Sequence, residues 1–254
     1  MIKYIKENHF AIIKLNRPEK RNALHPDLVN QLKIKLNEIK NDNDVRVLII
    51  TGEGKSFCAG ADLEYLNQIK DFSSIENEKD SESLAELFLE IYSFPIPTIA
   101  AVNGAAIAGG CGLANVCDFI VADEVNAKFG YSEVKIGFIP AIVSIFLIKK
   151  IGEVKAKQLL LTGDIIGAEK AYESGLVDYL AEDVLTESKT LANKLISNSD
   201  FSMKLTKKMI ADISNLNIKE AVDYCVRLNA ISRSSEDFKM GLENFLHKNE
   251  ARNE

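Results

Sequence analysis

Residues 99–123, IAAVNGAAIAGGCGLANVCDFIVAD, combine two apolar runs with a turn of small residues between them. The first run, 98–102, and the second, 119–122, have the composition of buried strands. The segment between them, 108–112, reads AGGCG, and glycine lets a backbone turn sharply or approach a ligand closely. The order strand, small-residue turn, helix and strand predicts an α/β fold.

The same theme occurs earlier in the chain. A strand-like run at 45–51, VRVLIIT, is followed by a second small-residue turn at 58–62, CAGAD. If each turn opens a helix, its first N–H groups are unpaired. Two such groups that converge on one oxygen would form an oxyanion hole, helped by the positive end of the helix dipole. Close packing of helix against strand explains the glycines equally well, so the spacing leaves both interpretations open.

Neither glycine-containing region has the pattern of a nucleotide-binding loop. The segment 52–56, GEGKS, ends like a P-loop, but Ile49 stands where the first glycine is required. The segment 104–112 is not followed by Lys-Ser or Lys-Thr. A phosphate-binding loop is therefore excluded at both places.

The composition excludes several classes of protein. Of the 254 residues, 46% are hydrophobic and 27% are charged, and the net charge of −6 argues against a nucleic-acid or anionic-membrane partner. No apolar run reaches about 18 residues and the start lacks signal-peptide features, so we expect no membrane segment and a cytoplasmic location. Four cysteines without C-x-x-C spacing predict buried, reduced thiols, and three histidines argue against a metal site.

Periodicity predicts the main elements and a division of the chain. Helices are expected over 26–39 and 62–69, and the last third is almost wholly helical in pattern. The polar segment 71–83 is poor in apolar residues, and we expect a mobile loop there. We divide the chain into a core, 1–196, and a C-terminal helical region, 197–254.

Several ordered blocks of the sequence resemble the crotonase, or enoyl-CoA hydratase/isomerase, family, over about residues 10 to 180. The blocks are Asn16-Arg17-Pro18 with Asn22-Ala23-Leu24, Phe57 to Leu63, Ala101 to Gly104 with Gly109 to Cys111, Cys117-Asp118, Phe129-Gly130 with Glu133, Gly137 and Ile139-Pro140, and Leu161 to Gly163. The resemblance implies a repeated ββα crotonase core with a C-terminal helical trimerisation region. Within the family, the chain most resembles the methylglutaconyl-CoA hydratase subgroup.

The resemblance also implies a site for an acyl-CoA thioester. The N–H groups of Ala61 and Gly109 would hold the thioester oxygen, and Glu133 would be the catalytic acid/base. Coenzyme A enters as part of the substrate, and no other cofactor and no metal are expected. The residues that would face the coenzyme A moiety are Lys20, Arg21, Ala23, Leu24, Ala59, Asp62 and Leu63, with Arg17 as a further candidate for its phosphates. The three basic residues could equally form a solvated loop, and Asp62 could cap a helix.

One departure from the family pattern concerns catalysis. Gly112 stands where typical hydratases carry a first glutamate, so the pair of carboxylates that grips one water is reduced to Glu133. Asp80, Glu82 and Glu86 are the other acids that could enter the site.

Three functions remain open. A hydratase, which adds or removes water across the α–β double bond of an enoyl-CoA, is favoured, because the block from Phe129 to Ser144 resembles the methylglutaconyl type. An isomerase that shifts the double bond with Glu133 as its single base is the alternative, and a non-catalytic acyl-CoA-binding protein belongs to a different class. The expected partners are an acyl-CoA thioester and copies of the chain, in a homotrimer or a dimer of trimers. In such an assembly Phe245 and Lys248 would reach the coenzyme A of a neighbouring subunit.

Overall fold

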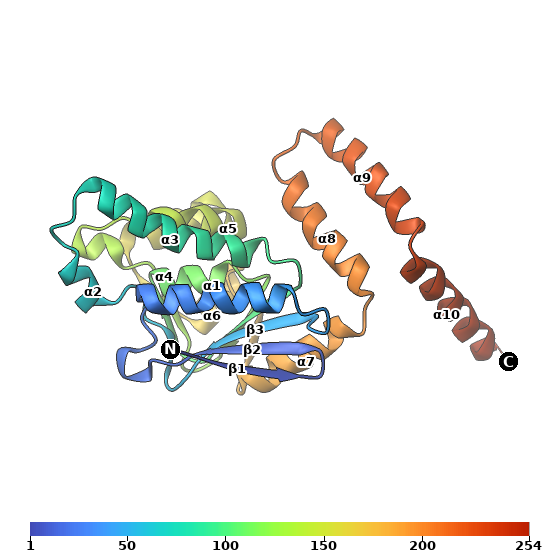
Figure 1. The fold of residues 1–254 in the computed structure, drawn as a ribbon, viewed down its shortest axis with the longest axis horizontal. Helices are drawn as coiled ribbons and strands as arrows, with labels where there is room; N and C mark the ends of the chain where they lie inside the picture. The colour runs from blue at the N-terminus through green and yellow to red at the C-terminus, as the bar shows by residue number, and fades with distance from the viewer. Residues whose placement is uncertain (254) are drawn as a thin grey trace.

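Two β-sheets form the core of the molecule (Figure 1). The computed structural model describes residues 1–253, with side chains up to Leu246. The larger sheet has the order β1-β2-β3-β5-β7-β10, with strands Ile2–Glu7, Phe10–Leu15, Val47–Gly52, Thr98–Val102, Phe119–Asp123 and Tyr179–Ala181. The smaller has the order β4-β6-β8-β9, with strands Ser56–Cys58, Ala105–Ile107, Lys128–Gly130 and Ile165–Gly167. Only the pairs β1–β2 and β8–β9 are antiparallel among the described strands.

The chain repeats a ββα unit. Strand β3 continues into β4 and α2 (Leu63–Gln68), and β5 continues into β6 and α4 (Gly109–Asn115). Strands β7 and β8 then lead to the 3-10 helix η2 (Glu133–Ile136) and to α5 (Ala141–Thr162). Because β4, β6 and β8 are neighbours in the smaller sheet, the segments that follow them start side by side. The predicted repeated ββα core is confirmed.

Helices cover both faces of the larger sheet. Besides the helices given above, the described chain contains η1 (Pro18–Lys20), α1 (Pro26–Lys40), α3 (Ser74–Tyr92), α6 (Ala168–Ser174), α7 (Val184–Ile196), α8 (Asp200–Ile213), α9 (Ile218–Arg233) and α10 (Glu236–Asn253). Along β2, Ile12 packs in the cluster that includes α7, whereas Ile13 packs in the cluster that includes α1 and α3. Each such buried side chain stabilises the fold by about 1.5–3 kcal/mol, so the strands form a rigid support.

The helix predicted over 26–39 is confirmed as α1. Pro26 occupies the first helical position, where its missing N–H costs nothing. The Asp27 N–H donates to Nδ1 of His25 at 3.2 Å, which caps the helix start. The apolar stripe predicted for this helix is buried against the sheet.

The expected mobile loop at 71–83 is wrong, because α3 already begins at Ser74. Ser73 and Glu76 form a capping box, in which each side chain bonds the backbone of the other residue. The first half of α3 is polar and exposed to solvent. The second half is anchored by Leu87, Phe88 and Ile91, which are fully buried. Capping and downstream burial outweigh the low apolar content of the segment.

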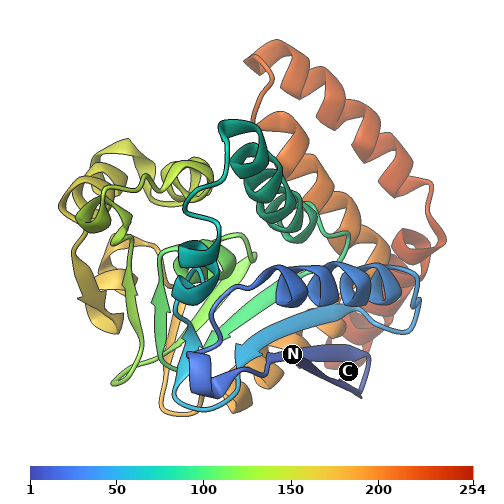
Figure 2. The ribbon, with the colours of Figure 1, turned by 60° about the vertical axis from the view of Figure 1, so that its left-hand side comes forward.

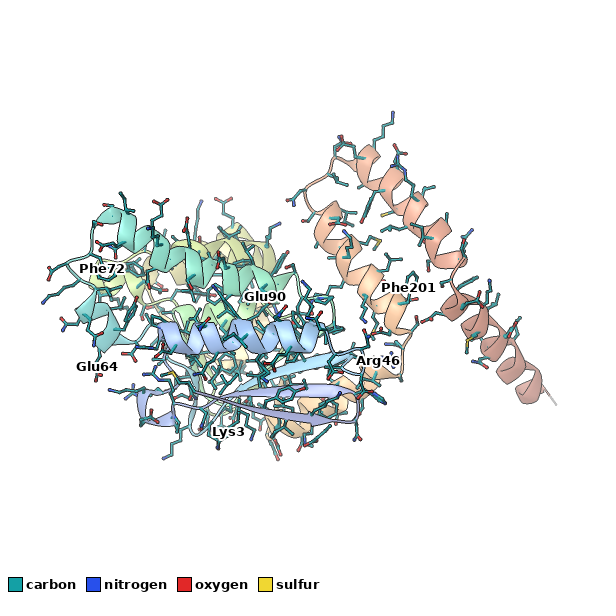
Figure 3. All side chains as sticks on the ribbon, in the orientation of Figure 1. Lys3, Arg46, Glu64, Phe72, Glu90 and Phe201 are labelled. Atoms are coloured by element: carbon teal, nitrogen blue, oxygen red, sulfur yellow. The ribbon has the colours of Figure 1, made fainter. Side chains whose placement is uncertain are left out.

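Helices α8 to α10 form a C-terminal arm (orange to red in Figure 1), and Figure 2 shows α9 at the outer edge of the molecule. Neither α8 nor α9 contains a buried residue. Where the arm meets the core, near Phe201 and Arg46 in Figure 3, Arg46 Nη2 donates to the backbone oxygen of Asn198. Lys207 Nζ bonds Asp118 Oδ2 at 2.6 Å. The division after residue 196 falls between α7 and α8 and stays a prediction.

Two further observations concern sequence predictions. Within residues 1–253, every helix is too short or too polar to cross a membrane. Lys248 lies beyond the last described side chain, so its expected contact with a neighbouring subunit falls outside the described residues.

Candidate active site

The first small-residue turn, 58–62, is held by a parallel β-bridge to Leu24. The Leu24 N–H donates to the oxygen of Gly60 at 2.7 Å, and the Asp62 N–H donates to the oxygen of Leu24 at 3.0 Å. Both bonds use residues on either side of Ala61. Among the described residues, therefore, the Ala61 N–H has no backbone acceptor, and it is free for a ligand.

The second small-residue turn, 108–112, opens α4 beside the first. Gly109 is the first residue of α4, so its N–H belongs to the unpaired first turn of that helix. A side chain on Gly60, whose φ is +86°, would lie 2.8 Å from the oxygen of Ile107 and 3.4 Å from the Gly109 nitrogen. The two glycines thus let the two turns touch, and the N–H groups of Ala61 and Gly109 come from touching backbone segments.

The geometry supports both interpretations of the Gly-Gly run, one for each glycine. A Cβ on Gly110 would lie only 2.0 Å from the oxygen of Cys58, so this glycine is required for close packing. The residue before the pair, Ala108, has φ 52° and ψ −124°, a conformation that costs an L-residue on the order of 1–3 kcal/mol. This strained residue stands directly before Gly109, at the point where strand β6 gives way to α4.

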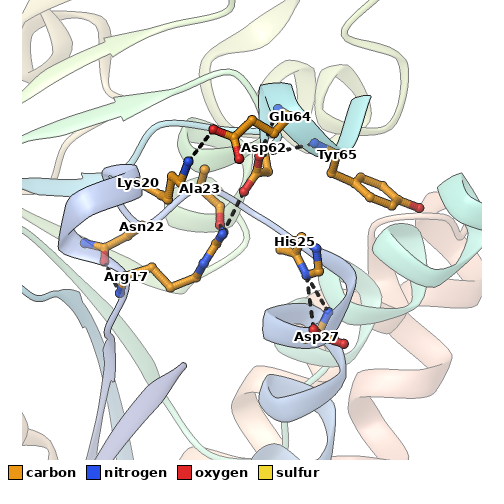
Figure 4. A network of polar contacts seen from close by, with 9 residues as sticks. All are labelled: Arg17, Lys20, Asn22, Ala23, His25, Asp27, Asp62, Glu64 and Tyr65. Atoms are coloured by element: carbon orange, nitrogen blue, oxygen red, sulfur yellow. Dashed lines mark hydrogen bonds and ion pairs between the residues drawn. The ribbon is translucent and has the colours of Figure 1, made fainter. Parts of the chain in front are cut away.

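A buried ion pair fixes the first turn from the other side (Figure 4). Arg17 Nη2 lies 2.7 Å from Asp62 Oδ2, and Arg17 Nη1 donates to the oxygen of Ala23 at 2.7 Å. The side chains of Arg17 and Asp62 are 11% and 6% exposed. The other carboxylate oxygen, Oδ1, accepts from the N–H groups of Glu64 and Tyr65 and caps α2. Burial alone would raise the pKa of Asp62, but the Arg17 and backbone hydrogen bonds outweigh it and lower that pKa.

Residues 17–24, which we call the strap, also carry a buried asparagine that sequence reasoning did not single out as functional. Asn22 is fully buried with φ 56°. Its Oδ1 accepts from the Arg17 N–H, and its Nδ2 donates to the oxygens of Glu53 and Ser56 at 3.0 and 2.8 Å. The strap is thereby tied to the β3–β4 connection. The sequence signals were its place in the Asn22-Ala23-Leu24 block and the tolerance of asparagine for a left-handed conformation.

The residues predicted to face coenzyme A lie together at the strap and the first turn. Ala23 and Leu24 are buried within this junction, and the Ala59 N–H donates to the oxygen of Arg21. Arg21 and Leu63 are exposed, and no described acidic residue pairs with Arg21. Lys20 pairs with Glu64 and Arg17 pairs with Asp62, so both cations already have a carboxylate partner, and their contact with coenzyme A stays a prediction. The lone free cation of the strap is Arg21.

Glu133 emerges beside the second turn. Strand β8 pairs with β6 so that Gly130 lies opposite Ile107, and the Ala108 N–H donates to the Gly130 oxygen at 2.8 Å. Glu133 follows at the start of η2, is 8% exposed, and its Oε2 has no hydrogen-bond partner among the described residues. Burial raises the pKa of this carboxyl, which brings it closer to neutral pH and suits proton transfer.

Comparison with known proteins decides the family. The sequence profile described as enoyl-CoA hydratase/isomerase matches residues 6–254. The chain belongs to the enoyl-CoA hydratase/isomerase family. It is 41% identical over 246 residues to a Thermus thermophilus protein named "Putative enoyl-CoA hydratase", covering 96% of this chain and 97% of the relative. It is 35% identical over 250 residues to a crotonyl-CoA hydratase of Syntrophomonas wolfei, covering 97% and 95%.

A solved structure of an enoyl-CoA hydratase/isomerase (crotonase) from Legionella pneumophila superposes with a TM-score of 0.91 at 36% identity, covering 97% of this chain and 96% of that one. The family recognised from sequence motifs is confirmed, and so is the prediction of an enzyme. The chain belongs to an enzyme family and has a buried, unpartnered carboxyl group at Glu133. Both facts favour an enzyme over a non-catalytic acyl-CoA-binding protein.

The departure at Gly112 has a steric cause in this family member. A Cβ on Gly112 would lie 2.3 Å from Val143 Cγ1 and 3.2 Å from Phe88 Cε2. Side chains from α5 and α3 therefore fill the volume into which a carboxylate at position 112 would project. Asp62 and Glu133 are the buried carboxylic acids within the described part of the chain. The site thus contains one free carboxyl group.

The three other acids proposed from the sequence do not supply a second one. Asp80 accepts a hydrogen bond from the hydroxyl of Tyr65. Glu86 pairs with Lys33 at 2.8 Å, and Glu82 is exposed on α3. The entry of these acids into the site stays a prediction, and in this structure the carboxylates of Asp80 and Glu86 are bonded elsewhere.

Proposed function

We propose that this chain is an enoyl-CoA hydratase, a hydro-lyase that adds or removes water across the α–β double bond of an enoyl-CoA. One observation carries the proposal. Two free backbone N–H groups, of Ala61 and Gly109, come from touching turns, and the unpartnered, buried Glu133 emerges from the adjoining strand. These are the groups that conjugate addition to a thioester requires.

The chemistry follows from these groups. The thioester oxygen accepts from the Ala61 and Gly109 N–H groups, which stabilise the negative charge as it forms; such a donor contributes about 3 kcal/mol. A water oxygen bonds to the β carbon while the Glu133 carboxylate takes one of its protons. The double-bond electrons move to the thioester oxygen as an enolate. The protonated Glu133 then returns that proton to the α carbon, which restores the carboxylate and completes the addition.

The names of the relatives support hydration over other reactions of the family. Curated relatives at 35% and 41% identity are named as hydratases over nearly their whole length. A third, from Clostridium acetobutylicum, is a short-chain-enoyl-CoA hydratase at 34% identity. We extend this activity to the present chain, with a methylglutaconyl-type acyl group among the candidates.

The single carboxyl favours a second candidate, an enoyl-CoA isomerase. In that reaction Glu133 would take a proton from the α carbon and return it at the γ carbon, through a dienolate held by Ala61 and Gly109. Only one acid/base is needed for this step, which matches the filled volume around Gly112.

A labelling experiment separates the two candidates. The purified protein is incubated with 2-enoyl-CoA, 3-enoyl-CoA and 3-methylglutaconyl-CoA in heavy-oxygen water, and the products are followed by mass spectrometry. Uptake of one heavy oxygen supports the hydratase and identifies the acyl group. A shifted double bond without added oxygen contradicts it and supports the isomerase.

The assembly and the coenzyme A contacts belong to the same proposal. The arm carries exposed apolar side chains, among them Val222, Val226 and Phe245, which are 54%, 61% and 62% exposed. Burying them between copies of the chain supports a homotrimer or a dimer of trimers. Light scattering at several protein concentrations tests this, and a monomer would contradict it. Arg21, as the free cation of the strap, is the first residue to substitute in a coenzyme A affinity measurement.

A further inference from the structure

Two buried polar atoms beside the site have no nitrogen or oxygen partner among the described residues. They are the hydroxyl oxygen of Tyr131 and Oε2 of Glu133. Tyr131 is fully buried, and Glu133 is 8% exposed. Buried polar groups are nearly always bonded, and where protein atoms do not satisfy them an ordered water commonly does.

The two residues are placed to share such a water. Both lie two positions apart on the segment that follows β8, the strand whose end adjoins the start of α4. The Tyr131 hydroxyl lies within hydrogen-bond reach of the Cys111 thiol, which neighbours Gly112 on α4, and a thiol is only a weak partner. Burial, followed by the nearby Cys111 and Glu133, raises the pKa of Tyr131 well above its ordinary value. The phenol therefore keeps its proton and acts as a hydrogen-bond donor.

Other unpartnered buried atoms lie elsewhere in the described chain. The Ser188 hydroxyl is on α7, on the opposite face of the larger sheet, and Asn115 is at the far end of α4. Arg46 and Asp200 are at the junction with the arm. Tyr131 is the one of this set that shares a short chain segment with Glu133.

We propose that the Tyr131 hydroxyl and the Glu133 carboxyl hold one buried water between them, and that this is the water consumed in hydration. The inference rests on the proposed hydratase function and adds a catalytic residue to it. The water donates one hydrogen to the Glu133 carboxylate and accepts one from Tyr131. One lone pair remains to bond the β carbon. After addition, the product hydroxyl keeps the second water hydrogen and the bond to Tyr131.

This arrangement explains how the site works with one carboxyl. Val143 and Phe88 exclude a side chain at Gly112, so a second anionic partner for the water has no place. A neutral phenol two residues before Glu133 orients the water without adding a second negative charge beside Glu133. Two neighbouring carboxylates would repel each other, whereas a phenol and a carboxylate do not.

The test compares Tyr131→Phe with Tyr172→Phe, which removes a hydroxyl from an exposed tyrosine on α6. For Tyr131→Phe we expect kcat for hydration to fall about 10- to 100-fold with KM little changed, because a hydrogen bond to the reacting water is lost. Exchange of the α protons of 3-enoyl-CoA with heavy water, which needs only Glu133 as base, stays within about 3-fold of wild type. Tyr172→Phe keeps both rates. Equal loss of hydration and exchange, or no loss of hydration, overturns the proposal.

A high-resolution crystal structure of the wild-type protein provides the second measurement, and it does not depend on activity. A water within hydrogen-bond distance of both the Tyr131 hydroxyl and Glu133 Oε2 supports the proposal, and its absence overturns it. If the wild-type protein takes up no heavy oxygen from any substrate, the hydratase function fails, and the crystal structure still decides whether the two residues share a water. It also decides the case if Tyr131→Phe does not fold.

Discussion

The two buried carboxyl groups, Asp62 and Glu133, differ in what surrounds them. Asp62 is paired with Arg17 and accepts two backbone N–H groups, and its pKa is lowered. Glu133 has an oxygen without a partner, and burial raises its pKa. Satisfied hydrogen bonds make Asp62 part of the support for the first turn. Their absence leaves Glu133 free to exchange a proton with a substrate.

The largest expected effect on activity comes from Glu133→Gln. Removal of a general base lowers kcat/KM by about 10²–10⁴-fold. The free energy of unfolding at neutral pH stays equal or rises, because a neutral amide replaces an unpartnered buried carboxylate. Steady-state kinetics and urea unfolding measure the two effects. Wild-type turnover in the variant would contradict the assigned role.

The largest expected effect on stability comes from Asp62→Asn. The substitution keeps a helix cap but leaves the Arg17 guanidinium buried without its anion, which costs about 3–5 kcal/mol. Turnover falls as well, because the Ala61 N–H loses its support. The matched control is Glu64→Gln, which breaks the exposed pair with Lys20 at a cost of about 0–1 kcal/mol. Urea unfolding of both variants checks the contrast, and equal losses would refute it.

A smaller effect is expected from Gly112→Ala. The new Cβ would overlap Val143 Cγ1, and overpacking of this kind costs about 1–3 kcal/mol. Val143→Ala removes the obstructing atoms, so the double variant should be more stable than the sum of the two single losses predicts. A double-mutant cycle in urea measures this coupling. Additive losses would show that Val143 does not fill the space beside Gly112.

The smallest effects are changes with pH, and they have opposite signs at the two carboxyls. Asp62 contributes stability above its ordinary pKa, and this contribution is lost as the pH falls through its lowered pKa. Glu133 contributes below its ordinary pKa, and this contribution is lost as the pH rises through its raised pKa. As a base, Glu133 gives kcat/KM an acid limb with its midpoint above the pKa of an exposed glutamate. A midpoint at or below that value would contradict the burial argument.

Local patterns in the sequence predicted most of the frame and two of the site groups. The apolar stripe of α1 and the apolar run of β5 predict the burial of these elements. The small-residue turns at Ala61 and Gly109 were located because each comes after a strand-like run in the sequence. The predicted loop at 71–83 failed because a capping box at Ser73 determines the helix start more strongly than composition does.

The remaining features depend on contacts between distant parts of the chain. The positive charge of Arg17 suggests a phosphate ligand when the sequence is considered alone. Only the folded structure shows that Arg17 pairs with Asp62. Gly112 stands in the sequence where typical hydratases carry a glutamate. The side chains that leave no room for one, Val143 and Phe88, belong to other helices. Sequence reasoning cannot identify such partners, because helical periodicity and turn propensity describe only neighbours along the chain.

The contact between Gly60 and Gly109 also determines when the protein can become active. The two glycines belong to different ββα units, so the loop between them must close before the two N–H groups meet. A partly folded chain that contains only the first unit has no place for a thioester oxygen. During synthesis, thioester binding can therefore appear only after the second unit has emerged and docked on the first, which makes it a reporter of their docking.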